Sequence, residues 1–138
     1  MIEFSFDPIP QLTEADLERV VHAFYARVRA DAQIGPIFND VIHDWPEHLD
    51  KLSAFWSSVM FTSGRYKGRP MPAHVRHAGR ITPQGFARWL ALWRETTDEL
   101  LPARHAAAMQ EKAERIAESL MLGIDFYRSK LPADARPA

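Results

Sequence analysis

The sequence predicts a single all-α domain. Four stretches of the chain place apolar residues three and four positions apart, the spacing of one face of a helix. Three of these stretches begin with a helix-capping side chain or an early proline. A length of 138 residues favours one compact core over two domains. We therefore expect four main helices joined by irregular segments.

The first helix is expected to begin at Thr13. Threonine is a good N-cap, and Glu14 and Asp16 suit the positive end of a helix dipole. The apolar stripe that follows consists of Leu17, Val20, Val21, Phe24, Tyr25 and Val28. The pair Gly35-Pro36 is expected to end any continuation of this helix.

The second helix is expected to begin at Asp44, in the sequence Asp-Trp-Pro-Glu. The aspartate is an N-cap, the proline suits the first turn, and the glutamate lies three residues after the cap. Its apolar face comprises Leu49, Leu52, Phe55, Trp56, Val59 and Met60. His48 shares that face because it lies four residues before Leu52.

The connection that follows is long and irregular. Residues 62–73 hold two glycines and two prolines, which rules out a long regular element. A short helical turn is expected around His74–His77. A simple up-and-down bundle has short loops, so this connection predicts a different arrangement of the helices.

Two long helices complete the chain. The third begins at Thr82-Pro83, a cap followed by proline at the first helical position, and Leu101-Pro102 ends it. Its inner face comprises Phe86, Trp89, Leu90, Trp93, Thr97 and Leu100. The last helix is expected over Ala103–Tyr127. We expect the helical domain to span residues 13–130, between an extended lead-in (1–12) and a flexible tail (131–138).

Composition excludes several classes of function. The chain has 17 basic and 18 acidic residues, so nothing in its net charge of −1 favours binding to a nucleic-acid backbone. The absence of cysteine excludes disulfides, thiolate nucleophiles, cysteine-ligated zinc, Fe–S clusters and covalent c-type haem. No signal peptide or apolar run of 18 residues is visible, and a cytoplasmic protein without a membrane span is expected.

Histidines are the first candidates for chemistry. His74 and His77 lie three residues apart, but no HExxH motif or carboxylate cluster supplies further ligands for a catalytic zinc. A lone neutral histidine in a constrained segment can instead bind one axial position of a planar cofactor. Tyr25, His48 and Trp89 would add polar donors on apolar helix faces. The residues alone leave two simpler interpretations open: His74 is a loop histidine, and Tyr25, His48 and Trp89 are packed side chains.

Five segments carry motifs at a spacing typical of one family. They are FYARVRADAQIGPIFND (24–40), DWPEHLDKLSAFWSSVMF (44–61), GRYKGRPMPAH (64–74), FARWLALWRET (86–96) and AERIAESL (113–120). The motifs Phe-Tyr-x-x-Val-Arg, Trp-x-Glu-His and Tyr-x-Gly-x-Pro-x-x-x-His are weak singly and specific together. With these motifs the chain resembles the truncated haemoglobins, specifically group III.

The resemblance implies a shortened globin, a two-over-two helical sandwich around non-covalent haem b. His74 matches the family's iron ligand, and it, rather than His77, completes the Gly-x-Pro-x-x-x-His spacing. Tyr25, Trp89 and His48 match the residues on the opposite, ligand-binding side. The other residues expected to contact the cofactor are Phe38, Leu52, Phe55, Trp56 and Phe86. The resemblance does not locate partners for the haem propionates, for which Lys51, Arg65, Arg69 and Arg76 are guesses.

The implied function is binding of O₂, CO and NO at a five-coordinate haem iron. Two hydrogen-bond donors facing the ligand would slow the escape of O₂, which fits O₂/NO or peroxide chemistry better than bulk oxygen transport. Turnover of NO with O₂ to nitrate and reduction of peroxide both stay open as enzymatic activities. An unidentified reductase is the expected partner, and the chain is expected to be a monomer or weak dimer. The alternative is a haem-free helical interaction or sensor domain with an aromatic pocket.

Overall fold

The computed structural model describes residues 11–130, and this part of the chain is helical without any strand. The expected lead-in and tail therefore lie outside the described residues, apart from Gln11 and Leu12. The elements are α1 (Glu14–Ala30), α2 (Gly35–Val41), α3 (Trp45–Phe61), α4 (Pro70–Val75), α5 (Pro83–Leu100) and α6 (Ala103–Ser129). The prediction of an all-α fold is confirmed. None of these helices is long and apolar enough to cross a membrane.

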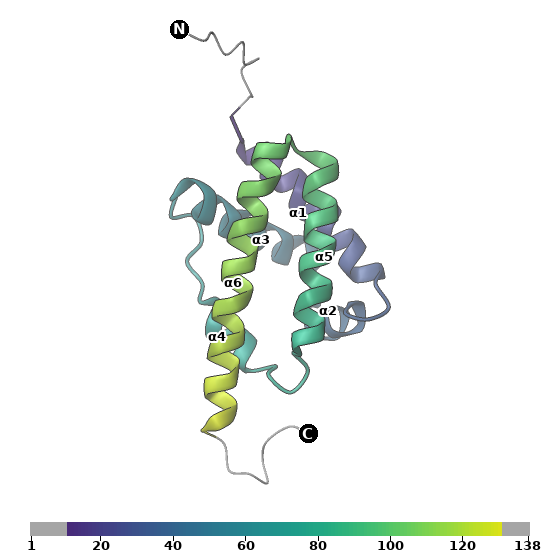
Figure 1. The fold of residues 1–138 in the computed structure, drawn as a ribbon, viewed down its shortest axis with the longest axis vertical. Helices are drawn as coiled ribbons and strands as arrows, with labels where there is room; N and C mark the ends of the chain where they lie inside the picture. Colours follow the sequence, from purple (N-terminus) through teal and green to yellow (C-terminus); the bar gives the residue numbers. More distant parts are fainter. Residues whose placement is uncertain (1–10, 131–138) are drawn as a thin grey trace, which may run out of the picture.

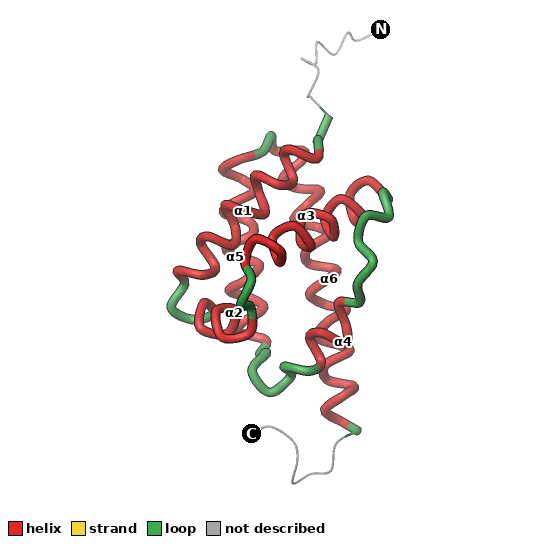
Figure 2. Tube along the Cα trace, turned by 180° about the vertical axis from the view of Figure 1, so that it is seen from behind, coloured by secondary structure: helices red, strands yellow, loops and turns green. Residues whose placement is uncertain are grey.

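The four long helices form two crossed layers. In Figure 1, α5 and α6 lie side by side, and α1 and α3 lie behind them. Helix α1 packs on both α3 and α5, so it joins the two layers. The two short helices sit at the margins, α2 against α1 and α4 against α6. Figure 2 shows the long loop that connects α3 to α4 along one side of the molecule.

Local capping starts three of the long helices where the sequence predicts. Thr13 and Asp16 form a reciprocal capping box at the start of α1. The side chain of Asp44 accepts a hydrogen bond from the backbone N–H of Glu47, and that of Thr82 accepts one from Gly85. These bonds satisfy backbone donors that the first turn of a helix leaves free.

Two short helices differ from the sequence-based expectation. The Gly35-Pro36 pair begins α2 rather than only ending α1. Glycine is needed there because a Cβ at position 35 would lie 2.8 Å from the carbonyl oxygen of Arg29. Helix α4 begins at Pro70 and ends at Val75, earlier than the turn expected at His74–His77. Prolines suit its first turn because the N–H groups there have no partner within the helix.

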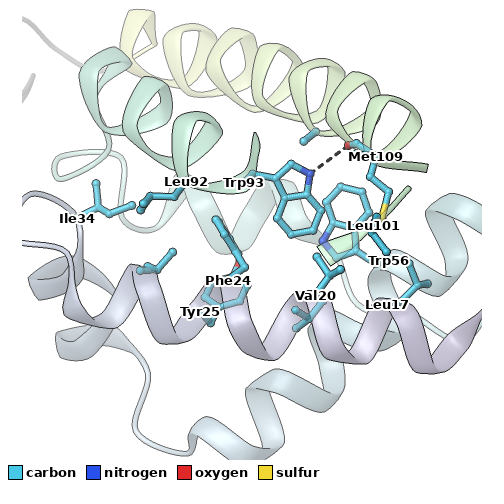
Figure 3. Close-up of a cluster of buried hydrophobic side chains, with 14 of the residues drawn as sticks. Leu17, Val20, Phe24, Tyr25, Ile34, Trp56, Leu92, Trp93, Leu101 and Met109 are labelled. Carbon is cyan, nitrogen blue, oxygen red and sulfur yellow. Dashed lines mark hydrogen bonds between the residues drawn. The ribbon is translucent and has the colours of Figure 1, made fainter. Parts of the chain in front are cut away.

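The core lies where α1 crosses α3 and α5. Phe24 and Trp93 are fully buried, and their rings meet edge to face at 4.8 Å. The indole of Trp56 stacks on that of Trp93 at 4.5 Å, and the Trp93 N–H donates to the carbonyl oxygen of Met109 in α6 (Figure 3). Paired aromatic rings of this kind add stability beyond the area they bury. The core therefore holds α1, α3, α5 and α6 in one fixed arrangement.

Candidate functional site

Helix α4 presents His74 with a defined tautomer. The ring Nδ1 lies 2.7 Å from the carbonyl oxygen of Pro70, one helical turn earlier. A carbonyl only accepts hydrogen bonds, so Nδ1 must carry the proton and Nε2 keeps a free lone pair. A histidine held in this way is oriented to bind a metal through Nε2. His77 lies in the turn after α4, where its backbone N–H donates to the carbonyl oxygen of His74.

A second group of side chains gathers around Tyr25 from three other helices. The Tyr25 ring lies 5.8 Å from Phe38 of α2, and 6.0 Å and 6.3 Å from the rings of Trp45 and His48 of α3. Trp89 of α5 reaches the same region, where its indole meets the ring of Phe24 at 5.5 Å. The structure thus brings together the three polar residues expected on the ligand side, Tyr25, His48 and Trp89.

The Tyr25 hydroxyl is a permanent donor. Burial raises the pKa of Tyr25 to about 12, and a hydrogen bond from the side chain of Trp89 offsets part of that rise. The indole N–H can only donate, so the phenol oxygen accepts from Trp89 and keeps its own proton to give to a third group. Tyr25 and Trp89 therefore act as one coupled pair.

His48 is held in its neutral form. Burial lowers the pKa of His48, and the positive charge of Lys51 lowers it further, against an opposing effect of Glu47.

Most of the expected cofactor contacts are only half-buried, unlike the core side chains beside them. Trp93 and Phe24 are fully covered, whereas a second set of residues keeps part of its surface exposed: Phe38, His48, Leu52, Phe55, His74, Phe86 and Trp89. These residues come from four helices, α2 to α5, and combine apolar walls with a histidine whose Nε2 is free. A flat apolar cofactor with a metal centre fits this set, since it would cover the rings and accept the imidazole.

Trp56 is the exception among the expected contacts. The structure places it in the core, 2% exposed, against Trp93. The indole of Trp89 lies parallel to that of Trp93, with the ring centroids 6.1 Å apart. This contact with a core side chain helps to orient one of the donors of the site.

Sequence reasoning missed several residues that shape the site. Trp45 is buried and packs against the rings of both Tyr25 and His48, and the guanidinium of Arg29 lies 4.5 Å from the centre of its ring. The Trp-x-Glu-His motif contains this tryptophan, but its cationic partner on α1 is visible only in three dimensions. The chain offers one further signal in Gly123, because a glycine inside a helix often marks a close approach.

That glycine supports α4. A Cβ at position 123 would lie 2.5 Å from Cε of Met71, so the methionine of α4 occupies the space that the glycine of α6 leaves open. Arg128, one turn further along α6, donates to the carbonyl oxygens of Ala78 and Ile81 in the turn after α4. Helix α6 therefore holds the segment that carries His74 at both ends.

The crossed helix pairs with a histidine on a short helix define a truncated globin fold. Among solved structures, the chain is similar to the crystal structure of group III truncated haemoglobin from Campylobacter jejuni. The TM-score is 0.72 at 27% identity, over 83% of this chain and 91% of that one. In sequence, the chain is 27% identical over 110 residues to the group 3 truncated haemoglobin Ctb of Campylobacter jejuni, covering 77% of this chain and 86% of the relative. No protein-family model matches the chain. The resemblance to group III truncated haemoglobins is confirmed by both sequence and fold.

Proposed function

We propose that this protein is a haem-binding globin that holds haem b non-covalently, with His74 as the protein ligand of the iron. The observation that carries the proposal is the hydrogen bond between Nδ1 of His74 and the carbonyl of Pro70, which leaves Nε2 free. The similarity to group III truncated haemoglobins in fold and sequence supports the same cofactor. His77 lies beyond the end of α4 and lacks this bond from its ring within the described residues.

Haem held by one imidazole supplies an open iron position for a diatomic ligand such as O₂, CO or NO. This chain's residues then determine how long each ligand stays. Tyr25 keeps its hydroxyl proton, and its ring lies 6.3 Å from that of His48. O₂ accepts hydrogen bonds better than CO, so these donors favour retention of O₂.

Strong retention suits chemistry on the ligand rather than delivery of it. A carrier must release its cargo, whereas a donor pair in a buried setting slows release. We therefore propose a role in O₂/NO or peroxide chemistry. His48, half-buried and neutral, lies at the edge of the donor cluster, where it is positioned to control the entry of ligands.

The test compares two histidine variants after reconstitution with haem. His74→Ala is expected to lose stable haem, measured as the intensity and position of the Soret band, and to recover a five-coordinate spectrum only with added imidazole. His77→Ala is the matched control and is expected to keep the spectrum of the unchanged protein. If His77→Ala loses haem and His74→Ala keeps it, the ligand assignment is wrong. If the unchanged protein shows no Soret band, the haem-free interaction domain becomes the better interpretation.

A further inference from the structure

Charge is distributed unevenly along this nearly neutral chain. From Lys51 to Arg94 there are eight Lys and Arg residues and not one Asp or Glu. The rest of the chain therefore carries nine basic residues and all 18 acidic ones. The net charge of −1 conceals this division, which is why composition alone gives no sign of a basic surface.

The basic stretch surrounds the helix that carries His74. Arg65, Lys67 and Arg69 lie in the loop before α4, and Arg76 and Arg80 follow it; all five side chains are exposed. Figures 1 and 2 show this loop and α4 at the margin of the molecule, outside the crossed helix pairs. The cations are thus displayed on the face where a partner would come nearest to His74.

Three of these cations are uncommitted. Arg65 pairs with Glu14, and Arg80 pairs with Asp40. Within residues 11–130, Lys67, Arg69 and Arg76 take part in no ion pair or cation–π contact. We name the surface formed by these three residues the α4 basic face. These three exposed cations flank α4 within ten residues and no described acidic side chain neutralises them, so the face can attract an anionic group.

The diatomic ligands of the proposed function cannot be that group, because they carry no charge for this surface to attract. The haem propionates, for which Arg69 and Arg76 are candidates, are the competing anion, and the Soret band of the face variant distinguishes them. A long polyanion such as DNA fits poorly, since the acidic remainder of the chain would repel it. A globular partner with a limited acidic face would meet the positive charges alone. Electrostatic complementarity of this kind accelerates association and orients the partner.

We propose that the α4 basic face is the docking site for an acidic one-electron carrier protein of the iron–sulfur or flavin class. This inference rests on the proposed haem function. One electron would pass from the reduced carrier to ferric iron, giving the oxidised carrier and ferrous iron, with no bond formed or broken. Docking beside α4 places the carrier on the side of the residue proposed to bind the iron, which shortens the path of the electron.

The test uses reversed charges and a plant-type [2Fe–2S] ferredoxin as the acidic carrier. The face variant carries the substitutions Lys67→Glu, Arg69→Glu and Arg76→Glu. The control variant changes the net charge by the same amount on α6, with Arg104→Glu, Lys112→Glu and Arg115→Glu. All three side chains of the control are exposed. Calorimetric titration with oxidised ferredoxin measures binding, with and without haem, and stopped-flow spectroscopy measures the rate of iron reduction.

At low salt, we expect the face variant to bind ferredoxin at least about tenfold more weakly and to accept electrons from it at least about tenfold more slowly. Both quantities should change by about twofold or less in the control. Added salt should remove the difference because it screens the charges. At a salt concentration that screens the charges, the small anionic reductant dithionite should reduce all three proteins at equal rates. Equal losses in both variants would overturn the proposal, as would tighter binding of a DNA duplex than of ferredoxin.

Two further outcomes separate this inference from the haem proposal. If the face variant loses its Soret band while the control keeps it, the cations hold the haem propionates and the docking proposal is wrong. If the unchanged protein binds no haem but the haem-free chain binds ferredoxin through this face, the haem function fails and the docking surface stands. The calorimetric titration needs no electron transfer, so it tests the docking surface independently of the haem function.

Discussion

Tyr25 and Trp89 are linked by a hydrogen bond, and this link changes what a single substitution can reveal. Removal of the Tyr25 hydroxyl takes away one donor but frees the indole N–H that it had engaged. The freed indole can then donate to a ligand in its place. The contribution of either residue is therefore measurable only with the other one varied as well.

We expect Tyr25→Phe to alter O₂ release only modestly and the double variant Tyr25→Phe/Trp89→Phe to alter it strongly. Loss of the last charge-assisted bond, worth about 1.5–3 kcal/mol, would raise the O₂ off-rate of the double variant roughly 10- to 150-fold above that of Tyr25→Phe. Stopped-flow ligand replacement measures these rates in the haem-loaded proteins. CO release, which depends little on hydrogen bonds, is the control. Additive effects of the two substitutions would show that the residues act separately.

At the scale of the elements, local signals made the long helices predictable. Thr13, Asp44 and Thr82 cap their helices with side chains only three residues from the groups they bind. The short helices were not predictable in this way. Helix α2 depends on Gly35 approaching the end of α1, and α4 begins at a proline that also suits a loop. Their positions are set by tertiary contacts, which periodicity does not report.

In the candidate site, too, some features follow from local sequence signals and others only from tertiary contacts. Motif spacing was enough to nominate His74 and Tyr25, whose roles remain predictions. The contact between Met71 and Gly123 that supports α4 could not be predicted, because the two residues lie far apart in sequence and neither suggests the other. Only the folded arrangement shows that a methionine fills the space beside a glycine.

We expect Gly123→Val to displace α4 by forcing Met71 out of its position. Valine has a higher helix propensity than glycine, so α6 itself should persist. The displacement should shift the ring resonances of His74 in NMR spectra, and addition of Met71→Ala should restore them. Leu122→Val, on the exposed side of α6, is the matched control and should leave those resonances unchanged. A failure of Met71→Ala to restore them would show that this contact does not position α4.

At the scale of the whole molecule, one carboxylate joins two of the long helices. Asp31, at the end of α1, accepts hydrogen bonds from the side chain of Arg88 in α5 and from the backbone N–H groups of Gln33 and Ile34. The bond from Arg88 is the largest influence that lowers the pKa of Asp31. The side chain of Asp31 is 7% exposed, so water screens its pair with Arg88 less than it screens the surface ion pairs.

The lowered pKa makes the stability that Asp31 contributes depend on pH. The folded state favours the carboxylate, so the contribution is fully present above the ordinary pKa of about 3.9 and is lost as the pH falls through the lower folded value. We expect Asp31→Asn to reduce the free energy of unfolding by about 1–3 kcal/mol at pH 7, and the difference to shrink in acid. Urea unfolding at a series of pH values measures this. Asp40→Asn, which breaks an exposed pair with Arg80, should cost less than about 1 kcal/mol, and an equal cost for both would contradict the prediction.

The dependence of α4 on α6 also has a consequence for the order of events during synthesis. A ribosome completes α4 some 50 residues before it adds Gly123 and Arg128, the residues of α6 that support α4. Until α6 is released, the six-residue helix α4 lacks its main packing partner and is too short to be stable alone. The His74 segment can therefore reach its final position only after α6 has been made. Capture of a cofactor by this protein would accordingly follow the synthesis of α6.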